Sequence, residues 1–151
     1  LKSRKRLQLI EICSKLRPMA MGNSMAPTLA EIEDMARATL GRIPPPLRQQ
    51  LTDLVIQVVD FPDDETIRTL ALNTPYDLLG MYSGVSLERK SVTAVPEDVD
   101  IIFLYRRPLL EYWIECGEEL KNLVRHVLIH EIGHHFGFSD ADMAAIEDSR
   151  D

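Results

Sequence analysis

Two histidines and a glutamate near residue 130 have the types and the spacing of a zinc site. His130 and His134 are four residues apart, so on a helix they lie one turn apart on the same face, close enough for both imidazoles to bind one ion. Glu131 lies beside this pair and can take a proton from a water molecule on the metal. The pattern HExxH on a helix therefore predicts a zinc ion with Glu131 as the general base.

The residues after this motif can supply a third ligand. Gly137 can adopt the left-handed conformation that ends a helix, and Asp140 can then return a carboxylate to the same ion. Two imidazole nitrogens and one carboxylate oxygen leave the fourth tetrahedral position open, as a catalytic zinc ion requires and a closed structural site does not. We therefore predict one zinc ion bound by His130, His134 and Asp140.

The alternative is an amphipathic helix whose histidines are merely polar, followed by a second helix that Ser139 caps and that Asp140 and Asp142 favour. This explains the acidic residues but not the paired imidazoles. His126 lies one turn beyond the pair and His135 points ~100° away from it, so we predict neither as a ligand. Apolar residues at helical spacing precede the motif: Leu120, Leu123, Val124, Val127, Leu128 and Ile132. The motif is thus predicted to lie on a helix that runs from Glu118 to about Phe136.

Other helices are indicated by their end signals. Thr28 and Glu31 have the spacing of a capping box, and the helix that they begin is predicted to end at Gly41. Pro108 begins a further predicted helix, which ends near Gly117.

Three segments are predicted as strands. Residues 54–59 are β-branched and almost continuously apolar, which favours a strand buried on both faces. Residues 100–105 form a second strand, and residues 85–92 are expected to add a short one.

The zinc motif resembles that of metzincin-type proteases with aspartate in place of the third histidine, as in the snapalysin-like peptidases. The wider chain is similar to the small bacterial zincin-like metallopeptidases with a minimal fold. Four phrases that precede the zinc helix in that family occur here in the same order: Ile43–Leu47, Val58–Pro62, Leu78–Gly84 and Ile101–Arg106. The resemblance covers about residues 28–146.

This resemblance implies an α+β fold of minimal zincin-like (metzincin-like) type, in which a small mixed β-sheet accompanies an N-terminal helix and the active-site helix. In zincins generally, the edge strand near the zinc helix pairs with an extended substrate. We assign this role to residues 100–105, with Ile102, Leu104 and Tyr105 as substrate-binding residues. Tyr82 either projects toward the substrate or packs as a structural aromatic residue. The oxyanion would be stabilised by Tyr82, Tyr105 or a backbone N–H.

Two functions are consistent with these features. The first is a zinc metalloendopeptidase that hydrolyses peptide bonds of a peptide or protein substrate, with Glu131 as general base. The second is a regulatory or binding module of zincin ancestry that binds zinc with little or no peptidase activity. Unlike a full metzincin, the chain has no tyrosine after Tyr112, and Met143 is too close to the ligands to form the methionine turn. These absences favour the second function, whereas the retained Glu131 favours the first.

Composition limits the partners and the location. With 151 residues, 45% of them hydrophobic and 27% charged, the chain has globular values. A net charge of −7 argues against nucleic acid as a partner. No apolar run approaches the ~18–20 residues that span a bilayer, so we expect no stable membrane association. Two cysteines, Cys13 and Cys116, do not make a disulfide framework, and no secretory signal is evident, which predicts a cytoplasmic protein.

The first residues differ from the rest in charge. Residues 1–17 contain six basic side chains and one acidic side chain. We predict that residues 1–26 are a basic tail that is disordered or not native, and that residues 27–151 form the zincin-like domain. The functional alternative for the tail is a basic amphipathic arm that touches a membrane surface or a partner.

Overall fold

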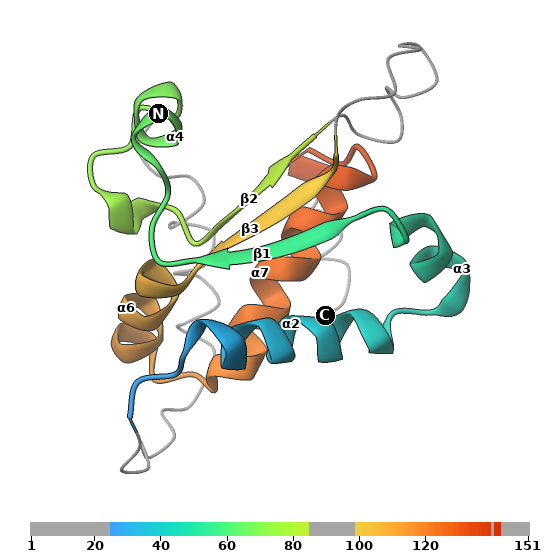
Figure 1. Cartoon of the computed structure of the whole chain (residues 1–151), viewed down its shortest axis with the longest axis horizontal. Coiled ribbons are helices and arrows are strands. Elements are labelled where there is room, and N and C mark those ends of the chain that lie inside the picture. The colour runs from blue at the N-terminus through green and yellow to red at the C-terminus, as the bar shows by residue number, and fades with distance from the viewer. Residues whose placement is uncertain (1–24, 85–98, 140, 143–151) are drawn as a thin grey trace.

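The computed structural model describes residues 25–84, 99–139 and 141–142. Within these residues the chain forms five α-helices, two 3-10 helices and one three-stranded sheet (Figure 1). The elements in order are α2 (Leu29–Arg42), α3 (Pro45–Arg48), η1 (Gln49–Leu51), β1 (Val55–Val59), α4 (Asp64–Thr69), η2 (Pro75–Asp77), β2 (Gly80–Ser83), β3 (Ile101–Tyr105), α6 (Arg106–Cys116) and α7 (Leu120–His135). The predicted α+β class is confirmed.

The sheet is mixed, and β3 is its central strand. β1 pairs with β3 in parallel and β2 pairs with β3 antiparallel, so that Ile102 lies opposite both Ile56 and Tyr82. The prediction that residues 100–105 form an edge strand is therefore wrong, because β3 has a hydrogen-bonded neighbour on each side. In the described part of the chain, the edge strand that contacts α7 is β2. The residue pattern predicted β1 and β3 as strands, but it did not predict β2, and it carries no information about which strands become neighbours.

The prediction that the first strand is buried on both faces is also wrong. Among the strands that the structure describes, β1 is the other edge of the sheet, and Val55 is 45% exposed. The helix α2 contacts β1 and covers one of its faces. A continuous apolar run was thus insufficient to distinguish a central strand from an edge strand.

The core lies between the sheet, α7 and α2. Figure 1 shows α7 passing behind the sheet, and α7 contacts β2, β3 and α2. All six apolar residues predicted to form the stripe of α7 are buried. They pack in one cluster with Ile32 and Ala36 of α2 and with Ile102 and Leu104 of β3, which are fully buried. The helix that carries HExxH is therefore held on its apolar side by both the sheet and α2.

The helix ends agree with most of the sequence signals. Thr28 caps α2 with Glu31 in a complete capping box, and Gly117, with φ 65°, ends α6. The predicted end of α2 at Gly41 is wrong, since α2 runs to Arg42 and Ile43 is its extended C-cap. Pro44 explains this end, because a residue before proline is disfavoured in the helical region.

No helix in the described part of the chain combines the length and the apolar character needed to cross a bilayer. The predicted strand at 85–92, Asp140, Met143 and all but the last two residues of the predicted tail lie outside the described residues.

Candidate metal centre

The end of α7 has the hydrogen bonds of a Schellman motif. The N–H of Phe138 donates to the carbonyl of Gly133 over 3.0 Å, and the N–H of Gly137 donates to that of His134 over 3.0 Å. Gly137 has φ 93°, in the region that favours glycine. The predicted left-handed end at Gly137 is confirmed, and it turns the chain immediately after the HExxH residues.

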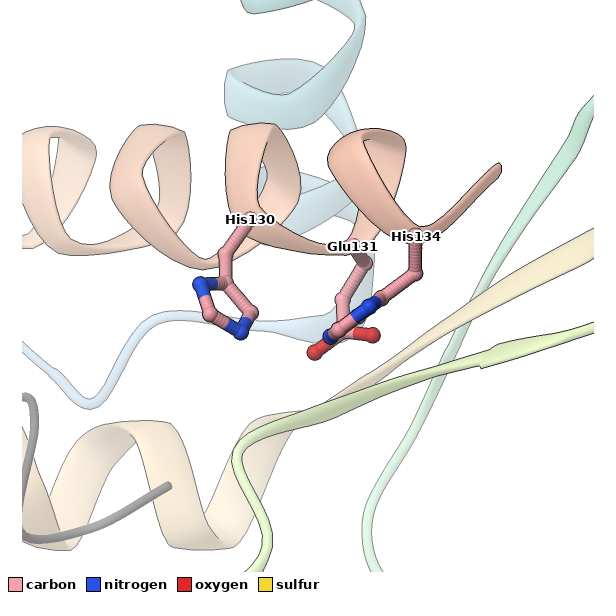
Figure 2. A group of neighbouring side chains, drawn as sticks. All are labelled: His130, Glu131 and His134. Carbon is pink, nitrogen blue, oxygen red and sulfur yellow. The ribbon is translucent and has the colours of Figure 1, made fainter. Parts of the chain in front are cut away.

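His130, Glu131 and His134 extend from the same side of α7, toward β2 (Figure 2). One potential ligand atom from each lies within 4.8 Å of the others, and the two imidazole centroids are 4.9 Å apart. Ligand atoms of a tetrahedral zinc ion with bonds of ~2.1 Å are ~3.4 Å apart. Modest side-chain rotations suffice to reach that spacing, so this donor set suits a zinc ion.

The imidazole of His134 is oriented by the chain that follows it. Its Nδ1 lies 2.9 Å from the carbonyl oxygen of Phe138. A carbonyl can only accept, so Nδ1 carries the hydrogen and Nε2 keeps the lone pair that a metal requires. Such an outer contact fixes the tautomer and the ring orientation of a metal-binding histidine. Residue types alone could not indicate this contact, because its acceptor is a backbone group.

Glu131 is a buried carboxylate, with 2% of its surface exposed. Its Oε2 accepts a hydrogen bond of 2.9 Å from the backbone N–H of Tyr82 in β2. In an antiparallel edge strand, alternate residues direct their N–H and C=O groups away from the neighbouring strand. The carboxylate of Glu131 therefore lies at the outer edge of β2 and joins the zinc-motif helix to that edge.

The hydroxyl of Tyr82 is bound within the protein. It donates to Oδ1 of Asp100 over 2.7 Å, and its oxygen lies 3.1 Å from Nδ1 of His135. Burial, together with the hydrogen bond and the negative charge of Asp100, raises the pKa of Tyr82 well above its usual range. These contacts are those of a structural aromatic residue, one of the two roles that the sequence left open, and substrate binding by Tyr82 stays a prediction.

The other residues predicted to bind substrate belong to the central strand. Ile102 and Leu104 are fully buried, and Tyr105 is 2% exposed. Backbone pairing between β3 and a substrate is excluded by β1 and β2, and this assignment is corrected. Burial, with smaller effects from the negative charges of Asp63 and Glu131, raises the pKa of Tyr105 well above its usual range.

The segment after α7 includes the start of a further helical turn. The N–H of Ser139 donates to Oδ2 of Asp142 over 2.8 Å, and the N–H of Asp142 donates to Oγ of Ser139 over 3.2 Å. The capping by Ser139 that the polar-helix alternative invoked is therefore present. Asp140 itself lies outside the described residues, so its role as third ligand stays a prediction.

Comparison with protein-family models identifies the family of this chain. The model for the zincin-like metallopeptidase family matches residues 51–150, more than half of the chain. A comparison with curated proteins found no match. The matched region contains the whole sheet, α6 and α7 with HExxH. This family implies zinc, and the geometry of His130, Glu131 and His134 suits that ion. The chain belongs to the zincin-like metallopeptidase family.

Proposed function

We propose that this protein is a zinc-dependent metallopeptidase that hydrolyses peptide bonds, with Glu131 as its general base. The observation that carries the proposal is the buried carboxylate of Glu131, whose oxygen lies within 4.8 Å of the ligand atoms of His130 and His134. A purely structural zinc ion is closed by four protein ligands and needs no base beside it. A carboxylate kept at this place is therefore better explained by catalysis.

We assign one zinc ion to His130, His134 and Asp140. When bound, Zn²⁺ polarises the peptide carbonyl and lowers the pKa of its bound water to about 7. His134 would use Nε2, because its Nδ1 donates to the carbonyl of Phe138. That contact also keeps the chain close to the imidazole two residues before Asp140, which supports Asp140 as the third ligand. An aspartate ligand adds negative charge, so the ion should be a weaker Lewis acid than in a site of three histidines.

Proton transfer is the role of Glu131. Its carboxylate accepts the proton of the attacking water and later passes it to the leaving amine. The N–H of Tyr82 holds Oε2 over 2.9 Å and so restricts the rotation of the carboxylate. The base is thereby oriented before any substrate binds.

We assign substrate pairing to β2 (Gly80–Ser83), in place of β3. β2 is an edge strand, it contacts α7, and its outer edge reaches Glu131 through Tyr82. The N–H of Tyr82 already donates to Glu131, so an extended peptide would pair with the other outward-facing backbone groups of this edge. It would be recognised mostly through its backbone, so weak sequence specificity is expected.

The test is a comparison of the wild type with Glu131→Gln, after zinc stoichiometry has been measured for both. Removing the base should lower kcat for a denatured protein mixture by roughly 10²- to 10⁴-fold, with one zinc ion per chain retained. Equal cleavage by the two proteins would refute the proposal. Zinc binding without cleavage by the wild type would instead indicate the regulatory or binding module.

A further inference from the structure

Three polar side chains from separate parts of the chain meet at the C-terminal end of the HExxH helix: Tyr82, Asp100 and His135. Asp100 and His135 are each 2% exposed. The hydroxyl of Tyr82 lies between them, 2.7 Å from Oδ1 of Asp100 and 3.1 Å from Nδ1 of His135. On its other side, Nε2 of His135 lies 3.4 Å from the carbonyl oxygen of Gln50. We call these three side chains the Tyr82 cluster.

The backbone packs closely over this cluster. A Cβ atom at Gly84 would collide with the carboxylate of Asp100 and would lie 3.0 Å from the hydroxyl of Tyr82. Asp100 also connects to β1, because its carbonyl accepts from the N–H of Val55 over 2.9 Å. The cluster therefore fixes the end of α7 relative to β2 and to the start of β3.

Tyr82 links the cluster to the catalytic carboxylate. Its side chain is held by Asp100 and His135, while its backbone N–H donates to Oε2 of Glu131. His135 directly follows the predicted ligand His134. Any movement of β2 along α7 would therefore change both the hydroxyl contacts and the contact with Glu131.

Stability alone gives little reason for such a cluster. Burying polar and ionisable groups costs free energy, and well-packed apolar residues of similar volume are often at least as stabilising. A satisfied polar cluster differs in that its hydrogen bonds are directional and fix one arrangement. The arrangement fixed here is the one that brings the N–H of Tyr82 to Glu131.

We propose that Asp100 and His135 are positioning residues that, through Tyr82, hold the carboxylate of Glu131 in the orientation needed for proton transfer. This inference rests on the proposed peptidase function for its catalytic meaning. Its structural part, the control of the Tyr82–Glu131 contact, can be measured without catalysis.

The test uses the full chain with Tyr82→Phe and Asp100→Asn, which preserve shape while they remove the hydroxyl or the charge. Hydrogen exchange of the residue-82 amide is measured in the metal-free protein. It is compared with the amide of Tyr105, which donates to the carbonyl of Leu79 in the same sheet over 3.0 Å. The exchange ratio is the exchange rate of the residue-82 amide divided by that of the Tyr105 amide. It separates the contact with Glu131 from the general stability of the sheet. Glu131→Ala removes the acceptor and gives the ratio expected when the contact between Tyr82 and Glu131 is completely lost.

We expect both variants to raise this ratio by roughly 10-fold, toward the value of Glu131→Ala. In the zinc-loaded proteins kcat should fall roughly 10- to 100-fold with little change in KM, while one zinc ion per chain is retained. Tyr76→Phe is the matched control. It removes a phenol hydroxyl from η2, outside the cluster, and should change neither readout.

An unchanged exchange ratio in Tyr82→Phe and Asp100→Asn would overturn the inference, and so would an unchanged kcat in an active enzyme. If the zinc-loaded wild type cleaves no peptide, the proposed function fails. The exchange ratio then decides alone whether the cluster holds Glu131.

Discussion

The predicted zinc ligands His134 and Asp140 can be tested by removing each side chain in turn. His134→Ala or Asp140→Ala should weaken zinc binding by more than roughly 100-fold, because even outer contacts of metal ligands are worth 10- to 100-fold. His126→Ala is the control, since His126 is outside the His130, Glu131 and His134 group and should leave affinity unchanged. Competition with a chromophoric chelator gives the zinc affinities of the wild type and of the three variants. Undiminished affinity in His134→Ala or Asp140→Ala would refute the assignment of that ligand.

The hydroxyl of Tyr82 makes stability depend on pH in the alkaline range. Its pKa is raised in the folded state, chiefly by burial and then by Asp100. The stabilisation is therefore complete below the ordinary tyrosine pKa of about 10 and is lost as pH rises through the folded value. Between pH 9 and 11.5, the free energy of unfolding should fall more steeply for the wild type than for Tyr82→Phe. Urea unfolding at several pH values measures both slopes, and equal slopes would contradict the assignment.

Sequence alone identified only part of the site. The spacing of His130 and His134 was sufficient to bring them to one face of a helix, and Glu131 followed from the same motif. The Tyr82 cluster left no such signal, because Tyr82, Asp100 and His135 are distant in sequence. They meet through the pairing of β2 with β3 and the packing of α7 against β2. Patterns within one helix can be read locally, whereas contacts between elements depend on topology.

At the scale of the elements, the approach of β2 to α7 depends on Gly80. A Cβ atom there would lie 2.7 Å from Cγ1 of Val127 and 3.1 Å from the carbonyl oxygen of Phe103. Gly80→Ala should destabilise the fold by about 1–3 kcal/mol, the usual cost of overpacking. Gly41→Ala is the control, because a Cβ at that helical position meets nothing within 4 Å. It should be neutral or stabilise by up to about 1 kcal/mol. Thermal unfolding measures both, and an unaffected Gly80→Ala would show that the packing of β2 on α7 is loose.

The elements themselves were more predictable than their arrangement. The helix of the zinc motif was predicted from Glu118 to about Phe136 and is observed as Leu120–His135. The end of this helix could be predicted because Gly137 adopts a left-handed conformation that few other residues adopt. The strand order β1-β3-β2 could not be predicted from the sequence, because parallel and antiparallel neighbours are both compatible with a short apolar strand.

For the molecule as a whole, zinc should act as a stabilising ligand. If the ion binds only the folded chain, free zinc at 100 times Kd adds about 2.7 kcal/mol to the free energy of unfolding. For a chain of this size that corresponds to a rise in Tm of roughly 5–10 °C. Differential scanning fluorimetry with zinc and with EDTA gives the shift, and His134→Ala should show none. If neither zinc nor EDTA changed the Tm of the wild type, this would argue against a bound zinc ion.

The packing of α2 has a practical consequence for anyone who trims this protein. The family match begins at residue 51, after α2, yet Ile32 and Ala36 of that helix are wholly enclosed by the cluster that supports α7. A recombinant fragment that begins at residue 51 would expose the apolar surface that α2 covers. Such a fragment should aggregate or bind other proteins non-specifically. A shortened protein for expression should therefore begin before Thr28.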